Sequence, residues 1–255
     1  MRYFIELSYK GTAFHGWQIQ ENADSVQSQL NNALSTLLRE PIETTGCGRT
    51  DSGVHASQFF AHFDADTVIH DAKDLVYRLN AILPREICVY EILKMEADAH
   101  ARFDAIFRSY CYYISREKNP FLQDYCWIFT QDLDLSLMNE AAALFINHSD
   151  YASFAKAGGQ QHTTLCTVTE AFFTEKNGIL CYQVSANRFL RGMVRTMVGT
   201  LLNLGEKKIN INQFKAILES GNRSNAGQSV PAQGLFLEEI RYPYLHSRRR
   251  KPFEL

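Results

Sequence analysis

The sequence predicts an α+β protein built from two split β-α-β units, a ferredoxin-like arrangement. Segments that alternate apolar and polar residues, as strands do, are interleaved with segments whose apolar residues share one helical face. The order strand, helix, strand, strand, helix, strand occurs on both sides of a linker at residues 96–102. In the second copy, Asn177-Gly178 separates two apolar runs, which is a strong signal for a β-hairpin.

The first unit is predicted to comprise residues 1–95. Residues 2–9 alternate as a strand does, and Asp24 or Ser25 can cap a helix whose apolar residues lie on one face. Strands are predicted on both sides of a glycine-rich loop, followed by a helix that ends before Pro84 and by a last strand. These later elements are expected at residues 42–47, 59–63, 72–83 and 87–93.

The second unit is predicted to comprise residues 96–255 and to repeat this order without clear sequence identity to the first. Its strands and helices are expected at residues 107–115, 135–147, 166–174, 179–185, 189–204 and 235–241, with a short extra helix at 213–219. Two such units side by side would form an extended, mostly antiparallel sheet with helices on one face. The other face would be free for a large ligand.

Composition excludes several classes of protein. The chain has 255 residues, of which 45% are hydrophobic, so it can bury a sizeable core. No apolar run reaches the roughly 18 residues of a membrane span, and the first residues do not resemble a signal peptide. The six cysteines form no C-x-x-C pair. We therefore expect a cytoplasmic protein with reduced thiols and no association with a membrane.

The net charge of −2 is not typical of a protein that coats itself with nucleic acid, so any such binding must depend on local basic surfaces. The candidates are Arg49, the three residues Arg188, Arg191 and Arg195, and the tail at residues 248–251. Plotted at about 100° per residue, the three arginines share one face of the predicted helix at 189–204 with Gly192 and Gly199. A partner could approach closely there, although an ordinary solvated basic face and a solvated tail fit the same pattern.

The most informative segment is the loop Gly46-Cys47-Gly48-Arg49-Thr50-Asp51-Ser52-Gly53-Val54-His55-Ala56. It places one carboxylate and one guanidinium among glycines, between two apolar runs. Glycine permits a positive φ or a close approach of a ligand, and catalytic residues tend to lie on loops held by a rigid scaffold. A tight turn with a capping aspartate and a solvated arginine would give the same pattern.

The loop resembles the active-site loop of the TruA family of tRNA pseudouridine synthases, whose pattern is G-R-T-D-x-G-V-H-A. Residues 102–112 resemble the family segment A-R-x-x-A-x-x-R-x-Y-x-Y, and residues 186–199 resemble its second signature. Weaker matches occur at residues 9–18, 25–27, 80–84 and 231–235, so the resemblance covers about residues 3–241. The departures from the family pattern, at Ser52, Asp104 and Ser229-Val230, affect no residue with an expected chemical role.

The resemblance implies the pseudouridine synthase fold, with both units forming one catalytic unit. It implies isomerisation of uridine to pseudouridine at positions 38, 39 and 40 in the anticodon stem-loop of tRNAs. That reaction breaks the bond from ribose C1′ to N1 of uracil, rotates the base and forms a bond to C5, from which a proton is lost. It needs no cofactor. The resemblance further implies a homodimer that grips the anticodon arm of tRNA.

The matching positions carry the family's roles over to this chain. Asp51 is the expected catalytic carboxylate, and the residues leave open whether it attacks C1′ or abstracts a ribose proton. Tyr110 would stack on the target base and assist at C5, while Arg195 would keep Asp51 ionised and oriented. Arg49 would replace the flipped nucleotide or clamp a phosphate. The remaining expected substrate-binding residues are Leu235, which would pack against the base, Arg188 and Arg191.

Other interpretations of these residues are possible. Tyr110 lies in an aromatic strand, which is more often core than binding site. His55, His62 and His100 could suggest a metal site, but no pair has the spacing of H-E-x-x-H, and we expect no metal. Asp51 begins a D-S-G triplet like that of aspartic proteases, but the second triplet that such enzymes need is absent. A non-catalytic RNA-binding module with two ferredoxin-like units stays open.

Overall fold

The computed structural model describes residues 1–156, 163–246 and 249–252. The α+β class predicted from the sequence is confirmed, and the chain divides into two compact units. The first unit comprises Met1–Ile106 and Leu237–Pro252, and the second comprises mainly Phe107–Phe236. In the described parts of the chain, no helix is both long and apolar enough to cross a membrane.

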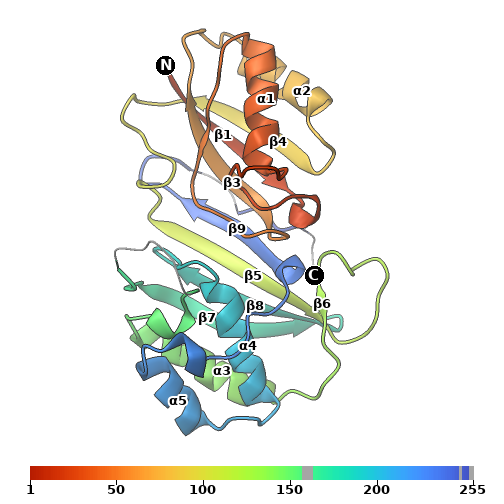
Figure 1. The fold of residues 1–255 in the computed structure, drawn as a ribbon, viewed down its shortest axis with the longest axis vertical. Coiled ribbons are helices and arrows are strands. Elements are labelled where there is room, and N and C mark those ends of the chain that lie inside the picture. Colours follow the sequence, from red (N-terminus) through yellow and green to blue (C-terminus); the bar gives the residue numbers. More distant parts are fainter. Residues whose placement is uncertain (157–162, 247–248, 253–255) are drawn as a thin grey trace. The chain divides into compact units, whose positions relative to one another are not determined.

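The first unit has the strand order β4-β1-β3 (Figure 1). Strands β2 and β9 both pair with β3. Its elements are β1 (Arg2–Tyr9), α1 (Val26–Leu38), β2 (Thr45–Gly46), β3 (His55–Asp64), α2 (Ala72–Ile82), β4 (Ile87–Lys94) and β9 (Leu235–Arg241), whose first two residues belong to the second unit. Strand β1 is antiparallel to both β3 and β4. Helices α1 and α2 pack against each other and cover one face of this sheet. The predicted split β-α-β order is therefore present in this unit.

The ends of these elements follow local signals in most cases. Ser25 caps α1, since its hydroxyl accepts the backbone N–H of Ser28 at 3.1 Å. Of the apolar residues expected on one face of α1, the first four are buried and the last two, Leu37 and Leu38, are half-buried. Strand β3 begins at His55, four residues before the predicted start at Phe59. The first part of this strand was not recognised because Gln58 interrupts its apolar residues. Gln58 is polar but fully buried, and its amide donates to Glu6 at 2.9 Å.

In the second unit, β8 lies between β5 and β7 and is antiparallel to both. The elements are β5 (Phe107–Ser115), β6 (Trp127–Ile128), α3 (Leu135–Leu144), β7 (Val168–Lys176), β8 (Ile179–Ala186), α4 (Met193–Gly205) and α5 (Ile211–Glu219). The predicted hairpin at Asn177-Gly178 is confirmed, with φ values of 54° and 74° that fit the turn expected for this pair. Helix α3 packs on α4 and β7, and α4 contacts β5. Short β6, which is parallel to β5, was not predicted.

The boundary between the units differs from the expected division at residue 95. Residues 96–106 belong to the first unit because their backbone is hydrogen-bonded there. The N–H of Ala101 donates to Nδ1 of His62 at 3.1 Å, and the hydroxyl of Tyr242 donates to the carbonyl oxygen of Ala101 at 2.6 Å. The linker is thus fixed between β3 and the segment that follows β9.

His62 is 6% exposed and packs edge-on against the ring of His100. Burial, together with the positive charges of Arg2 and His100, lowers the pKa of His62 to about 4 from an ordinary value of 6.5. Between these two values the unfolded chain binds a proton at His62 that the folded chain does not bind. The free energy of unfolding therefore decreases as the pH falls through this window.

We expect the wild type to lose about 2–3 kcal/mol more stability than His62→Gln when the pH is lowered from about 6.5 to about 4. Glutamine does not titrate, and its side-chain oxygen can replace Nδ1 as the acceptor for the N–H of Ala101. Urea denaturation of both proteins across this range measures the difference. Equal losses in the two proteins would show that His62 does not titrate as described.

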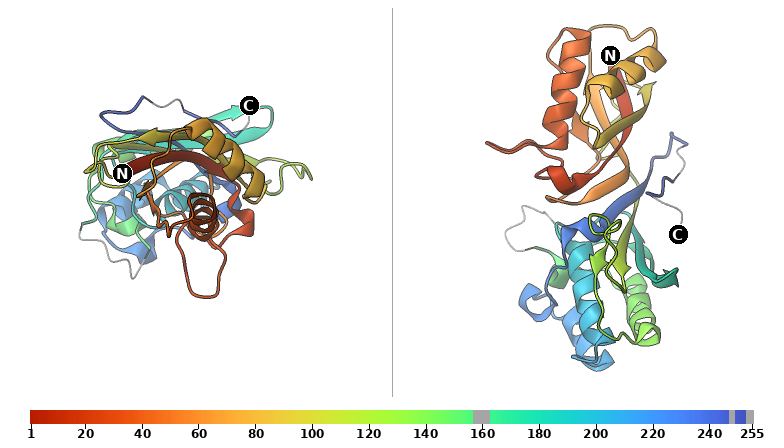
Figure 2. Two further views of the ribbon diagram at one scale, coloured as in Figure 1. Left: turned by 90° about the horizontal axis from the view of Figure 1, so that it is seen from above. Right: turned by 90° about the vertical axis from the view of Figure 1, so that its right-hand side faces the viewer.

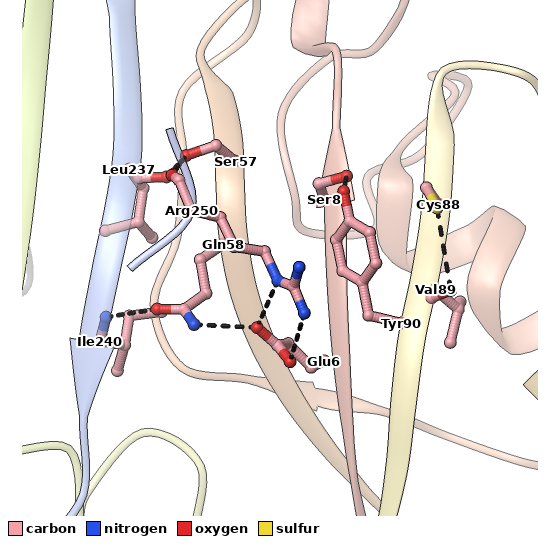
Figure 3. A network of polar contacts seen from close by, with 10 residues as sticks. All are labelled: Glu6, Ser8, Ser57, Gln58, Cys88, Val89, Tyr90, Leu237, Ile240 and Arg250. Carbon is pink, nitrogen blue, oxygen red and sulfur yellow. Dashed lines mark hydrogen bonds and ion pairs between the residues drawn. The ribbon is translucent and has the colours of Figure 1, made fainter. Parts of the chain in front are cut away.

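Arg248 of the basic tail lies outside the described residues, but ion pairs hold Arg249 and Arg250, so this part of the tail is not the solvated end that its sequence allowed. The guanidinium of Arg250 donates to both carboxylate oxygens of Glu6, at 2.8 and 3.3 Å, and lies over the ring of Tyr90 at 3.9 Å (Figure 3). The hydroxyl of Ser57 donates to the carbonyl oxygen of Arg250. Arg249 pairs with Glu238, a fully buried carboxylate, at 2.6 Å.

These contacts determine what covers the sheet of the first unit. Arg249 and Arg250 lie on the face opposite α1 (Figure 2), so the part of this face around Glu6 and Glu238 is not free for a ligand as the sequence suggested. Glu6 and Glu238 are acidic residues at buried strand positions, and buried carboxylates need charged or hydrogen-bonding partners. The arginines of the tail supply them.

Candidate active site

The loop that carries Asp51 connects β2 to β3 within the first unit. Residues 51–54 form a turn, in which the N–H of Val54 donates to the carbonyl oxygen of Asp51 at 3.1 Å. Gly53 has φ of 79°, a conformation that favours glycine. Asp51 is half-buried and Arg49 is exposed on the same loop. The structure thus presents a carboxylate and a guanidinium from one loop.

A second segment, residues 11–17, packs against residues 50–54 of the loop. The N–H of Trp17 donates to the carbonyl oxygen of Thr50 at 3.3 Å, and the N–H of Gly53 donates to that of Phe14 at 3.4 Å. Gly11 and Gly16 have no room for a side chain, because a Cβ there would overlap the carbonyl oxygens of Val54 and Thr50. These two glycines were missed in the sequence, since the close approach joins segments about 40 residues apart.

Tyr110 lies on β5 in the second unit, opposite Val184 of β8. It is half-buried, and its ring makes an edge-to-face contact with Phe189, with 5.1 Å between centroids. Its neighbours Tyr112 and Tyr113 are buried, so the interpretation of this aromatic strand as core holds for them. Tyr110 differs from both because it is only half-buried.

Arg195 lies in the first turn of α4. Its Nε donates to the carbonyl oxygen of Val230 at 2.7 Å, and the N–H of Val230 donates to the carbonyl oxygen of Arg195 at 3.2 Å. The side chain is half-buried. The loop before Pro231 therefore fixes the stem of Arg195, and the hydroxyl of Tyr112 fixes the same loop by donating to the carbonyl oxygen of Pro231 at 2.8 Å.

The prediction that Arg188, Arg191 and Arg195 share one face of this helix is wrong. Helix α4 begins at Met193, after Gly192 with φ of 71°, so Arg188 and Arg191 precede the helix and do not share a face with Arg195. Arg188 is half-buried and Arg191 is exposed. The sequence pattern predicted a helix from residue 189 because apolar residues occur on both sides of Gly192. The left-handed conformation of Gly192 instead ends the preceding segment, and the helix begins only at Met193.

Gly199 is not open to a partner either. A Cβ at Gly199 would overlap the carbonyl oxygen of Gln228, and the N–H of Gly227 donates to the hydroxyl of Thr200 at 2.9 Å. Residues 227–230 of the same chain therefore occupy this side of α4. The glycine permits close packing within the chain rather than the approach of a ligand.

Leu235 begins β9 and is 6% exposed, so little of its side chain reaches the surface.

Arg108 has a positioning contact that the sequence did not reveal: its guanidinium donates to the carbonyl oxygen of Asn187 at 2.9 Å. The side chain of Asn187 in turn accepts the N–H of Thr167 at 2.8 Å. Arg108 and Asn187 both lie in segments that resemble the family motifs, so the sequence indicated that each could matter. It could not indicate their contact, because they lie far apart in the sequence.

The histidines considered as metal ligands have other partners. Nδ1 of His55 accepts the N–H of Gly11 at 3.0 Å, and Nδ1 of His62 accepts that of Ala101. Among residues 1–156, 163–246 and 249–252, no group of three or more histidine, cysteine or acidic side chains could hold a metal ion.

The seven predicted site residues are divided between the two units. Asp51 and Arg49 share one loop of the first unit, which offers a carboxylate for acid, base or nucleophilic chemistry beside a cation suited to phosphate. The second unit offers the half-buried aromatic residue Tyr110, a type suited to stacking, and the half-buried guanidinium of Arg195, a type suited to a carboxylate or phosphate. Arg188, Arg191 and Leu235 lie in the second unit as well.

Comparison with known proteins identifies the family. Residues 141–243 match a family described as tRNA pseudouridine synthase. Proteins named tRNA pseudouridine synthase A are similar over nearly the whole chain. The one from Porphyromonas gingivalis is 46% identical over 95% of this chain and 97% of its own length. Those from Bacteroides fragilis and Treponema denticola are 44% and 40% identical, over 95% and 94% of this chain and 96% and 92% of their own lengths. The chain belongs to the tRNA pseudouridine synthase A family.

Proposed function

We propose that this protein isomerises uridine to pseudouridine at positions 38, 39 and 40 in the anticodon stem-loop of tRNAs. The observation that carries the proposal is the identity of 40–46% over nearly the full length of relatives named for this activity. The half-buried carboxylate of Asp51, on a loop clamped by residues 11–17, is compatible with it.

In the proposed reaction, the bond from C1′ to N1 breaks and a bond from C1′ to C5 forms. The proton leaves C5, and N1 gains one, so the change is an isomerisation without a net redox step. Asp51 acts on the ribose, either by attack on C1′ or by abstraction of a ribose proton. Fixing the loop before the substrate arrives lowers the entropic cost of holding the carboxylate against the sugar.

The other roles are proposed from the motifs that these residues occupy. Tyr110 stacks on the target base and assists the loss of the C5 proton, and Arg195 pairs with Asp51 to keep it ionised. Arg49, exposed beside Asp51, contacts a phosphate or fills the position of the flipped nucleotide. Substrate contacts are also assigned to Leu235, Arg188 and Arg191.

The proposed partner is the anticodon arm of tRNA, held by a cytoplasmic homodimer in which both units of a chain contribute to one catalytic unit. A dimer would help to explain how a chain with a net charge of −2 binds RNA, because arginines from two copies can line one surface even when the single chain is not basic. No cofactor is required by the reaction as written.

The test uses transcripts of one tRNA in which a single uridine is kept at position 38, 39 or 40, with compensating changes that preserve the stem. A carbodiimide adduct that stops reverse transcription locates each pseudouridine. We expect modification of all three transcripts and none in a control transcript that lacks these uridines. Pseudouridine only at other positions would contradict the proposed specificity, and tight binding without any pseudouridine would favour the non-catalytic RNA-binding module.

A further inference from the structure

Tyr9, at the end of β1, makes a side-chain contact to the residue that precedes Asp51. Its hydroxyl lies 2.9 Å from Oγ1 of Thr50, and the two side chains are 4% and 8% exposed. A hydrogen bond between two buried hydroxyl groups has a defined geometry, because water cannot replace either partner readily.

The aromatic ring of Tyr9 has little freedom to move. It packs edge-on against Phe59, with 5.4 Å between centroids, and lies 6.3 Å from Trp17. Trp17 and Phe59 stack on each other at 4.2 Å, and the indole fills the space where Gly46 would otherwise carry a Cβ. The hydroxyl of Tyr9 is therefore held at a fixed point beneath the loop.

Thr50 is consequently held at two atoms from two different segments. Its Oγ1 binds Tyr9, and its carbonyl oxygen accepts the N–H of Trp17 at 3.3 Å. Threonine is β-branched, so fixing Oγ1 also restricts the backbone to which Cβ is attached. Since the carbonyl group of Thr50 is part of the peptide plane that leads to Cα of Asp51, these two contacts restrict the position of the backbone from which the Asp51 side chain projects.

We propose that Tyr9 is a positioning residue for Asp51, which acts through the hydroxyl of Thr50. The inference rests on the proposed function, in which Asp51 is the catalytic carboxylate. Tyr9 does not contact the substrate in this account. Its loss should therefore slow the chemical step and leave the affinity for tRNA unchanged, since a displacement of about 1 Å is enough to lower a rate up to about 100-fold.

The test compares Tyr9→Phe with Tyr3→Phe under single-turnover conditions, at a temperature well below the thermal unfolding midpoint of each variant. Tyr3 is the matched control because it lies on the same strand, is 2% exposed and uses its hydroxyl to accept the N–H of Ile69 at 3.1 Å. We expect Tyr9→Phe to lower the rate of pseudouridine formation at least about 10-fold. The affinity for tRNA should stay within about twofold, and Tyr3→Phe should keep the wild-type rate.

Two variants of Thr50 sharpen the test. Thr50→Val removes the hydroxyl at nearly constant shape and should lower the rate as Tyr9→Phe does, with no further loss in the double variant. Thr50→Ser keeps a hydroxyl and should retain most of the rate. A wild-type rate in Tyr9→Phe, or an equal loss in Tyr3→Phe, would overturn the inference while the proposed function stands. A wild type that forms no pseudouridine would overturn both.

Discussion

Replacing Asp51 by Asn is expected to lower the rate of pseudouridine formation at least about 1,000-fold while the dissociation constant for tRNA stays within about twofold. The substitution removes the negative charge and the basicity of the carboxylate but keeps nearly the same shape. The loop should stay in place, because the substitution leaves unchanged the backbone hydrogen bonds from Trp17 to Thr50 and from Gly53 to Phe14. Single-turnover kinetics and filter binding measure the two quantities separately.

Ser52→Ala is the matched control for this prediction. Ser52 is the next residue of the loop, and its hydroxyl donates to the carbonyl oxygen of Phe14 at 3.3 Å. We expect this variant to keep the wild-type rate within a few-fold, so a general disturbance of the loop would be visible. An active Asp51→Asn protein would remove Asp51 from the mechanism. Loss of tRNA binding in that variant would mean that Asp51 serves affinity instead.

Arg250→Met is expected to lower the free energy of unfolding by about 2–4 kcal/mol. Glu6 is buried, and the substitution leaves its carboxylate with the amide of Gln58 but without the charged partner (Figure 3). The contact to the ring of Tyr90 is lost as well. Chemical denaturation measures the change, and the exposed neighbour Lys251 provides the control variant Lys251→Met, which should stay near the wild type.

The double variant Glu6→Gln with Arg250→Met tests the cause of that loss. Removing the buried charge together with its partner should cost less than Arg250→Met alone, because no uncompensated carboxylate remains. If Arg250→Met is as stable as Lys251→Met, the tail does not stabilise the first unit through this pair.

The elements predicted well from the sequence are those specified by nearby residues. Helix α1 follows from the Ser25 cap and its apolar spacing, and the β7–β8 hairpin follows from Asn177-Gly178. The family assigned from the motifs around Asp51 and Tyr110 is confirmed by the near-full-length relatives. In each case the signal lies within a few residues of the feature that it specifies.

The features that were missed depend on contacts between distant residues. Arg250 bonds to Glu6 across 244 positions of sequence, so nothing local distinguishes this tail from a solvated one. Gly16 looks like an ordinary loop glycine until Thr50 is placed against it. The face of α4 was mistaken because a single left-handed residue, Gly192, delays the start of the helix. The roles of Asp51, Tyr110 and Arg195 stay predictions that kinetics must decide.

Release of tritium from C5-labelled uridine is the measurement that tests the central claim most directly. An unmodified tRNA transcript labelled at C5 is incubated with the wild-type protein, and the released tritium is followed with time. Because the new bond to C1′ replaces the bond to hydrogen at C5, we expect release up to the number of uridines at positions 38, 39 and 40 in that transcript. Absence of release from several such tRNAs, with binding intact, would contradict the assignment of this chain as a pseudouridine-forming enzyme.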